Sequence, residues 1–138
     1  MKGIIKKTKH FPGSLYSVNA SSLTAISSLY TKNERALVYV ESKDISYCLI
    51  SVGASMVGSV VPFWLDKQSP ARKAIVSAWN EGPLSDLNKI KKGQELGYFQ
   101  MGSTVILLFP ESIKFNNNFL SLSKTVKLGE VLIDLQER

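Results

Sequence analysis

Residues 36–52 read Ala-Leu-Val-Tyr-Val-Glu-Ser-Lys-Asp-Ile-Ser-Tyr-Cys-Leu-Ile-Ser-Val and are the clearest indication of the fold class. Its two ends, Ala36–Val40 and Tyr47–Val52, are rich in β-branched and aromatic residues, which favour strands. The polar segment Glu41-Ser42-Lys43-Asp44 separates them, so the pattern predicts a β-hairpin. A central hairpin in a short chain indicates a mainly β protein.

Most of the remaining segments also resemble short strands bounded by Gly and Pro. Gly3–Lys9 precedes the turn pair Pro12-Gly13, and Met56–Leu65 is a further apolar run. Helical character is limited to Ser22–Tyr30, which is short and rich in Ser. Residues 70–88 lack a clear period, and we expect them to form a loop extension over the sheet.

A weak internal repeat, called the echo below, refines the fold class. Residues 90–97 (Ile-Lys-Lys-Gly-Gln-Glu-Leu-Gly) resemble residues 126–133 (Val-Lys-Leu-Gly-Glu-Val-Leu-Ile), with an offset of 129 − 93 = 36 between Gly93 and Gly129. Each glycine is expected to form a tight turn at positive φ, which Gly adopts at little cost. Paired turns of this kind are typical of barrel-sandwich hybrid folds. We therefore predict a barrel-sandwich-hybrid-like β core with one short helix.

Length and composition indicate one compact domain spanning residues 1–138. The chain is 44% hydrophobic and 20% charged, ordinary values for a globular protein, and it is long enough to bury a core. No apolar run approaches the roughly 20 residues that cross a bilayer as a helix. The sequence therefore predicts no transmembrane segment.

The net charge of +6 favours contact with anionic surfaces. Lys2, Lys6, Lys7 and Lys9 cluster near the amino terminus, and a basic residue near an anionic leaflet contributes about 1 kcal/mol. Plain solubility is the alternative explanation of this charge. Nucleic acid is not an expected partner, because the lysines are scattered and accompany no recognised binding motif.

Cys48 and His10 are each the only residue of their type, which limits the chemistry they can support. A single cysteine cannot form an internal disulfide, and Cys48 lies in an apolar run where a buried, inert thiol is expected. One cysteine and one histidine do not make a protein zinc site, so no metal is expected. Because it stands next to Phe11-Pro12, we interpret His10 as a strand or surface residue rather than a catalytic base.

Gly102-Ser103-Thr104 stands directly before the apolar run Val105–Phe109. Taken alone, a Gly-Ser pair between two strands is a structural turn. The stretch nevertheless closely resembles the self-cleavage segment of bacterial phosphatidylserine decarboxylases, in which a Leu-Gly-Ser-Thr motif splits between Gly and Ser. Here Met101 replaces the Leu, which is a mild apolar exchange.

The resemblance extends over nearly the whole chain. Phe11–Asn19 is similar to the family's Pro-Gly-x-Leu-Phe-Ser-Val-Asn segment, and Asn33-Glu34-Arg35 matches its Asn-Glu-Arg. Val52–Ser59 is similar to its Val-Gly-Ala-x-x-Val-Gly-Ser. Leu120–Ser123 and Lys127–Glu130 follow in the family's order.

This resemblance implies a cofactor made from the chain itself. Ser103 is the expected cleavage nucleophile and attacks the carbonyl of Gly102, the expected cleavage site. The products would be residues 1–102 and 103–138, the second beginning with a pyruvoyl group derived from Ser103. That group is the electron sink for decarboxylation, so pyridoxal phosphate is not expected.

Two further segments take their expected roles from the family. The resemblance implies that Ser17, Val18 and Asn19 line the substrate pocket and hold the head-group phosphate. Turn chemistry at a strand end is the alternative, since Ser and Asn favour turns. For Asn33-Glu34-Arg35, a structural ion pair that holds a turn is favoured over catalysis.

Family members begin far upstream of the position that matches Gly3. Their upstream part carries membrane-associating helices, an acidic residue and a His-x-x-His segment; the acid and one His activate the cleavage serine. The chain is therefore expected to be the carboxy-terminal portion of the enzyme and to cleave slowly or not at all alone. Expected partners are phosphatidylserine, an anionic membrane surface and a separate amino-terminal segment, and a homodimer is left open.

The leading hypothesis for function is the decarboxylation of phosphatidylserine to phosphatidylethanolamine, at the cytoplasmic face of a membrane and without spanning it. The alternative is a non-catalytic remnant that keeps the β fold and binds anionic lipid or a partner subunit. A lipoyl or biotinyl carrier domain is set aside, because neither Met-Lys-Met nor Asp-Lys-Ala occurs in the chain.

Overall fold

The computed structural model divides the chain into two compact units, residues 1–108 and 109–138. The first unit contains all of the helices and strands assigned in the described residues. The structure describes residues 2–43, 45–55, 60–62, 89–99, 104–111, 113, 125–127 and 129–130. The candidate cleavage site, Gly102-Ser103, lies outside the described residues, and so does the predicted loop over residues 70–88.

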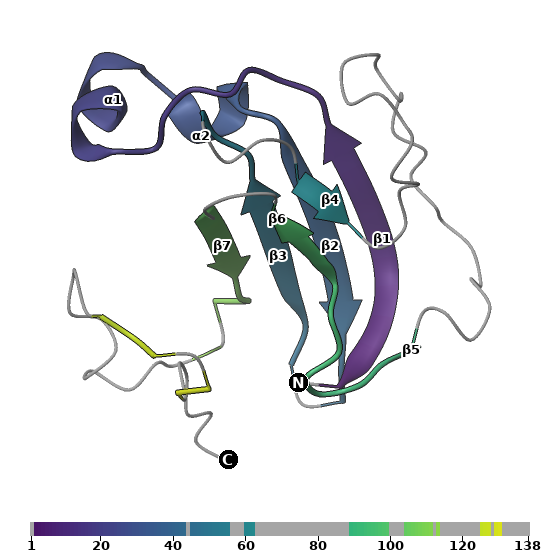
Figure 1. Ribbon diagram of the computed structural model, residues 1–138. Coiled ribbons are helices and arrows are strands. Elements are labelled where there is room, and N and C mark those ends of the chain that lie inside the picture. Colours follow the sequence, from purple (N-terminus) through teal and green to yellow (C-terminus); the bar gives the residue numbers. More distant parts are fainter. Residues whose placement is uncertain are drawn as a thin grey trace. The chain divides into compact units, whose positions relative to one another are not determined.

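The main sheet has five strands in the order β5-β1-β2-β3-β7. These strands are β1 (Gly3–Phe11), β2 (Arg35–Glu41), β3 (Tyr47–Val52), β5 (Lys89–Ile90) and β7 (Thr104–Leu108). Every neighbouring pair in the sheet is antiparallel. Figure 1 shows the four longer strands side by side, curled into a half-barrel.

The predicted hairpin is confirmed and forms the centre of this sheet. β2 and β3 pair from Arg35 opposite Val52 to Val40 opposite Tyr47. Alternate residues of β2, namely Ala36, Val38 and Val40, are each no more than 2% exposed. Burial of a valine side chain stabilises the fold by about 1.5–3 kcal/mol, so this face of β2 is a large part of the core.

A second, two-stranded sheet pairs β4 (Val60–Pro62) with β6 (Gly97–Phe99) in antiparallel register. β4 also approaches β2, which brings this ribbon against the main sheet. β4 is the described part of the strand predicted over Met56–Leu65.

The helical segment begins earlier than predicted and is interrupted, so that two short helices stand where one was expected. α1 (Ala20–Ala25) begins after Asn19, whose side-chain Oδ1 accepts a hydrogen bond from the Ser22 N–H at 2.8 Å. α2 (Leu29–Lys32) follows Ser28, which has the left-handed values φ 56° and ψ 37°. A helix cannot continue through that conformation. Leu29 is buried and anchors α2.

The two echoed turns have the same local geometry. Gly93 has φ 82° and Gly129 has φ 85°, as the sequence predicted. The Lys91 N–H donates to the Gln94 side-chain oxygen, and the Lys127 N–H donates to the Glu130 carboxylate, both at 2.9 Å. In return, the Gln94 N–H donates to the Lys91 carbonyl at 3.1 Å, and the Glu130 N–H donates to the Lys127 carbonyl at 3.0 Å. The prediction of a mainly β fold is confirmed, and the echo is a real repetition of turn structure.

Candidate functional site

One end of the main sheet collects most of the segments that the family resemblance singles out. A row of paired residues runs across this end from Phe11 through Arg35 and Val52 to Thr104. Thr104 begins β7 and follows Ser103 directly in the sequence. β1 ends at this row, and the chain from Pro12 to Glu34 returns to it through α1 and α2 (Figure 1).

Asn33 ties this end of the sheet together. Its side chain is fully buried, and Oδ1 accepts a hydrogen bond from the Tyr16 N–H at 3.0 Å. Nδ2 donates to the Tyr16 carbonyl at 2.8 Å and to the Gly53 carbonyl at 3.0 Å. The amide thus uses all its buried donors and one acceptor to join the segment before Ser17 to the residue after β3.

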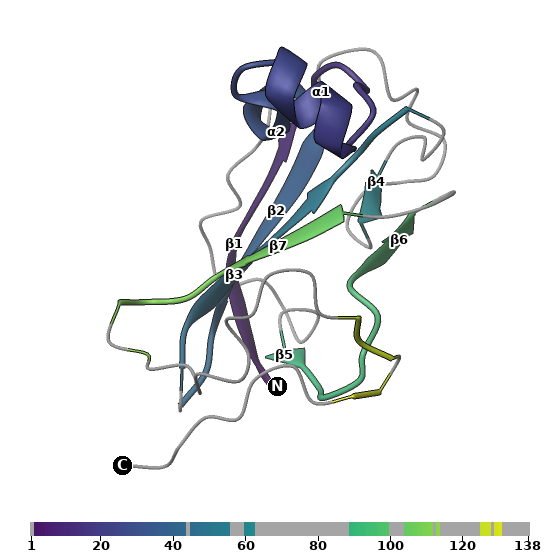
Figure 2. The ribbon, with the colours of Figure 1, turned by 90° about the vertical axis from the view of Figure 1, so that its left-hand side faces the viewer.

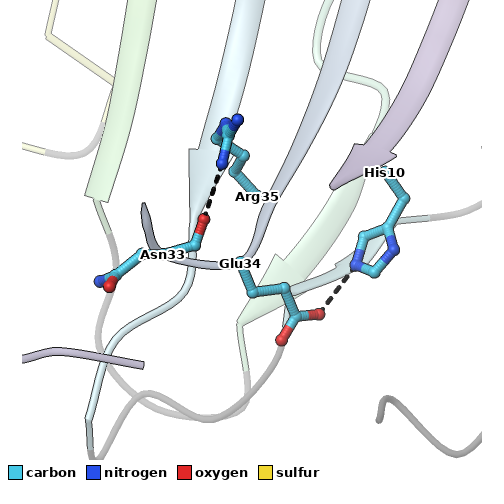
Figure 3. Close-up of polar contacts among 4 residues, drawn as sticks. All are labelled: His10, Asn33, Glu34 and Arg35. Carbon is cyan, nitrogen blue, oxygen red and sulfur yellow. Dashed lines mark hydrogen bonds and ion pairs between the residues drawn. The ribbon is translucent and has the colours of Figure 1, made fainter. Parts of the chain in front are cut away.

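Glu34 adds further contacts through its backbone and its side chain. We call the hydrogen bonds of Asn33 and Glu34 to Ser14, Tyr16 and Gly53 the clasp. Its N–H donates to the Ser14 carbonyl, and its own carbonyl accepts from the Gly53 N–H, both at 2.8 Å. Its Oε1 lies 2.8 Å from His10 Nε2, and both side chains are buried (Figure 3). Asn33 and Glu34 together therefore hold Gly53 from both sides.

His10 lies in β1, as predicted, but it is buried rather than on the surface. Its Nε2 is occupied by Glu34, and its Nδ1 is buried without a hydrogen-bond partner. An imidazole bound in this way is suited to fixing Glu34, and the geometry does not favour it as a free catalytic base.

Arg35 completes the turn from α2 into β2. Its Nη1 donates to the carbonyls of Thr31, at 2.6 Å, and Asn33, at 3.0 Å. Its guanidinium lies 4.3 Å from the centre of the Phe11 ring, and Lys9 Nζ lies 4.7 Å from the same centre. Burial lowers the pKa of Arg35 from its ordinary value, and the guanidinium still carries its charge at neutral pH.

The tripeptide Asn33-Glu34-Arg35 therefore holds a turn, as the sequence predicted. The structure shows no ion pair among these three described residues; the Glu34 carboxylate instead forms a hydrogen bond with His10. No local pattern predicts this pairing, because the two residues are 24 positions apart in the sequence.

Ser17, Val18 and Asn19 lie directly after the Tyr16 backbone that Asn33 holds. Ser17 and Val18 are half-buried, and Asn19 is exposed and caps α1. The structure thus shows turn and cap chemistry for Asn19. The predicted contact of these three residues with a substrate head group stays a prediction.

The Pro12-Gly13 turn explains why a glycine precedes this segment. A Cβ built on Gly13 would lie 2.5 Å from the Lys32 carbonyl oxygen and 2.7 Å from the backbone of the next two residues. Ser14 N–H donates to that same carbonyl at 2.9 Å, and Ser14 pairs with Asn33 in a parallel bridge. Only a residue without a side chain permits such a close approach.

Within the described part of the chain, no group of three His, Cys, Asp or Glu side chains could hold a metal ion. Cys48 is a free thiol, partly buried in β3, and burial raises its pKa. No helix among the described residues is long and apolar enough to cross a membrane.

Comparison with known proteins identifies the family. A sequence model of the phosphatidylserine decarboxylase family matches residues 1–134. The phosphatidylserine decarboxylase proenzyme of Dechloromonas aromatica is 34% identical over 128 residues, covering 93% of this chain and 45% of that protein. The proenzyme of Idiomarina loihiensis is 35% identical over 138 residues, covering 98% of this chain and 47% of that protein.

A third relative gives the same result at higher identity. The proenzyme of Coxiella burnetii (strain Dugway 5J108-111) is 40% identical over 111 residues, covering 79% of this chain and 38% of that protein. The chain thus spans less than half the length of each of these relatives. It is homologous to phosphatidylserine decarboxylase, a carboxy-lyase of phospholipid biosynthesis. Because the match covers residues 1–134, the chain belongs to the phosphatidylserine decarboxylase family.

Proposed function

We propose that this chain is the serine-bearing part of a pyruvoyl-dependent enzyme that converts phosphatidylserine to phosphatidylethanolamine. The observation that carries the proposal is the family match across residues 1–134, which includes an intact Gly102-Ser103-Thr104. In this proposal Ser103 is the pyruvoyl precursor and Gly102 the residue before the scissile bond. The whole domain, residues 1–138, contributes to one catalytic unit.

The proposed self-cleavage uses atoms of the chain and one water molecule. The Ser103 hydroxyl attacks the Gly102 carbonyl, and the acyl group moves from the Ser103 nitrogen to its oxygen to give an ester. Elimination breaks the ester and releases residues 1–102 with a free carboxylate. Hydrolysis of the dehydroalanine left at position 103 releases ammonia and leaves the pyruvoyl group, which supplies an electron sink when the substrate amine is bound.

The described residues near position 103 are held firmly by backbone pairing and hydrogen bonds, which supports a role in which Ser103 must stay in one place. Thr104 is paired with Val52 at the end of the sheet. Gly53, which follows Val52, is bonded on one side by the Asn33 amide and on the other by the Glu34 carbonyl. The same clasp holds Tyr16, so that it sets the start of the proposed substrate segment Ser17–Asn19 relative to β3.

The base that activates Ser103 comes, in this proposal, from residues outside the 138-residue sequence. A serine hydroxyl at its free pKa is a weak nucleophile and requires a positioned base. The sequence contains one histidine, and its Nε2 is already occupied by Glu34. By resemblance to the family, whose upstream part carries an acid and histidines, a separate amino-terminal segment is the proposed partner.

A decarboxylation assay tests the proposed function. The chain is joined to the amino-terminal part of the Idiomarina loihiensis relative, and phosphatidylethanolamine formation is measured on vesicles containing phosphatidylserine. We expect activity in the joined protein and its complete loss in Ser103→Ala. Ser42→Ala, in the loop between β2 and β3, is the matched control and should keep full activity. Equal activity of Ser103→Ala and the parent protein would exclude the proposed role of Ser103.

A second candidate function is anionic-lipid binding without catalysis, which the net charge of +6 favours. It predicts vesicle binding by the joined protein with no phosphatidylethanolamine formed. The same assay therefore separates the two candidates.

A further inference from the structure

The chain between β1 and β2 makes an excursion, residues 14–30, that contains no charged side chain in 17 residues. It includes α1, a helix of six residues of which none is buried. Tyr16 and Leu23 are 43% and 42% exposed. Isolated helices this short are not stable in water, and α1 has no packed face of its own to compensate.

Hydrogen bonds and a buried side chain hold the two ends of the excursion in place. Asn33 bonds both backbone groups of Tyr16, and Ser14 bonds the Lys32 carbonyl. Leu29 is 2% exposed and anchors the return through α2. Figure 2 shows α1 and α2 together at one end of the main sheet. The exposed apolar side chains are thus presented on a fixed support.

The charges that flank the excursion are positive. Residues 1–40 contain six basic residues and one acidic residue, Glu34. That carboxylate is 3% exposed and bonded to His10, so it adds no negative charge to the surface. Lys32 is exposed in α2, and Lys9 and Arg35 lie over Phe11 at the same end of the sheet.

This arrangement changes the expectation for the amino-terminal lysines. They are neighbours in the sequence, but β1 is extended, so roughly 20 Å of strand separates Lys2 from Lys9. Lys6 forms a 3.0 Å ion pair with Glu41 near the other end of the sheet. Of the four lysines, Lys9 is the one that adds to the cations beside the excursion.

We infer that residues 14–30 are the membrane-contacting surface of this unit, with Tyr16 and Leu23 entering the interface of an anionic bilayer. Apolar side chains between cations are the pattern that binds such an interface, through buried apolar area and attraction to anionic lipid. A second copy of the chain is a poorer occupant, because it would bring the same cations into contact. The inference rests on the proposed function in one respect: Ser17–Asn19, the proposed head-group segment, lies within the same excursion.

A pair of fluorescent labels tests this inference on the full chain. In a Cys48→Ser background, Leu23→Cys carries an environment-sensitive fluorophore. The matched control is Ile4→Cys, at the other end of β1, because Ile4 is 43% exposed and Leu23 is 42% exposed. Equal far-ultraviolet circular dichroism of the two labelled chains verifies that both are folded.

With vesicles of mixed phosphatidylserine and phosphatidylcholine, we expect a blue shift of the label at position 23 and its quenching by spin-labelled lipid. The label at position 4 should show neither change, and vesicles of phosphatidylcholine alone should give a much smaller effect at position 23. In a chain without the label, Leu23→Asp should weaken vesicle binding by about tenfold or more.

Three outcomes would overturn the inference: no shift at position 23, equal shifts at both positions, or a shift at position 23 that depends on protein concentration without vesicles. The last would indicate self-association through this surface. None of these readouts requires cleavage at Ser103. A lipid-dependent shift at position 23, together with no phosphatidylethanolamine formed by the joined protein, would therefore keep this inference and reject the proposed function, and the reverse result would do the opposite.

Discussion

At the scale of single residues, the Asn33 side chain is the contact on which the candidate site depends most. It makes three hydrogen bonds in a fully buried position, to two residues that are 17 and 20 positions away in the sequence. Two of these bonds need the amide as donor. An acid in the same place would direct a carboxylate at the carbonyls of Tyr16 and Gly53.

Asn33→Asp should therefore destabilise the fold by about 3 kcal/mol or more, because the carboxylate oxygen that replaces Nδ2 is buried against two carbonyl oxygens and has no donor. Asn19→Asp is the matched control: Asn19 is exposed and caps α1, where Asp serves as well as Asn. Urea unfolding followed by circular dichroism measures both. Similar losses in the two variants would show that the clasp does not hold the structure.

His10 and Glu34 form the second residue-scale contact. A hydrogen bond that includes a charged partner contributes about 1.5–3 kcal/mol, and its buried position protects it from salt. A double-mutant cycle of His10→Ala and Glu34→Ala should give a coupling energy in that range. The exposed Lys6–Glu41 pair should give less than about 1 kcal/mol in a parallel cycle. A smaller coupling for His10–Glu34 than for Lys6–Glu41 would contradict the interpretation.

At the scale of elements, β3 carries two ionisable groups at successive positions, the buried Tyr47 and the partly buried Cys48. Burial raises the pKa of Tyr47 above its ordinary value of 10.0 and the pKa of Cys48 above 9.0. Both groups are neutral when protonated, so the unfolded chain loses these protons at lower pH than the folded chain. Their contribution to stability is fully present below about pH 8 and is lost as the pH rises through the alkaline range.

The urea midpoint of unfolding should accordingly stay level near neutral pH and fall above pH 9. The double variant Tyr47→Phe with Cys48→Ser removes both titrating groups while keeping the strand. Its midpoint should fall less steeply over the same range, and what remains measures the other groups of the chain. An unchanged slope would show that β3 does not contribute to the alkaline loss.

The elements also show what the sequence can and cannot predict. The β2–β3 hairpin and the turns at Gly93 and Gly129 were predictable, because each depends on residues close together in the chain. The break between α1 and α2 was not predictable. Ser28 adopts the left-handed conformation there, and a serine carries no sequence signal for that conformation. The Asn33 clasp and the His10–Glu34 pair were not, because their partners come together only when β1, β2 and β3 have formed a sheet.

At the scale of the whole molecule, family membership is the basis of the proposed chemistry, and the main sheet brings the family segments together at one end. The family segments Pro12–Asn19, Asn33–Arg35 and Val52–Gly53 meet at one end of the sheet, and Thr104 begins β7 in the same row. Nothing in the local sequence of Gly102-Ser103 distinguishes a cleavage site from a turn. Its proposed role comes from the family alone, and it requires a direct chemical test.

The most direct test is intact mass spectrometry of the chain produced together with the amino-terminal part of a relative. We predict two products divided after Gly102: residues 1–102, and a fragment of 138 − 102 = 36 residues whose first residue is a pyruvoyl group in place of Ser103. Ser103→Ala should give one uncleaved species. A single full-length species from the parent chain, with position 103 still an ordinary serine, would exclude the proposed role of Ser103.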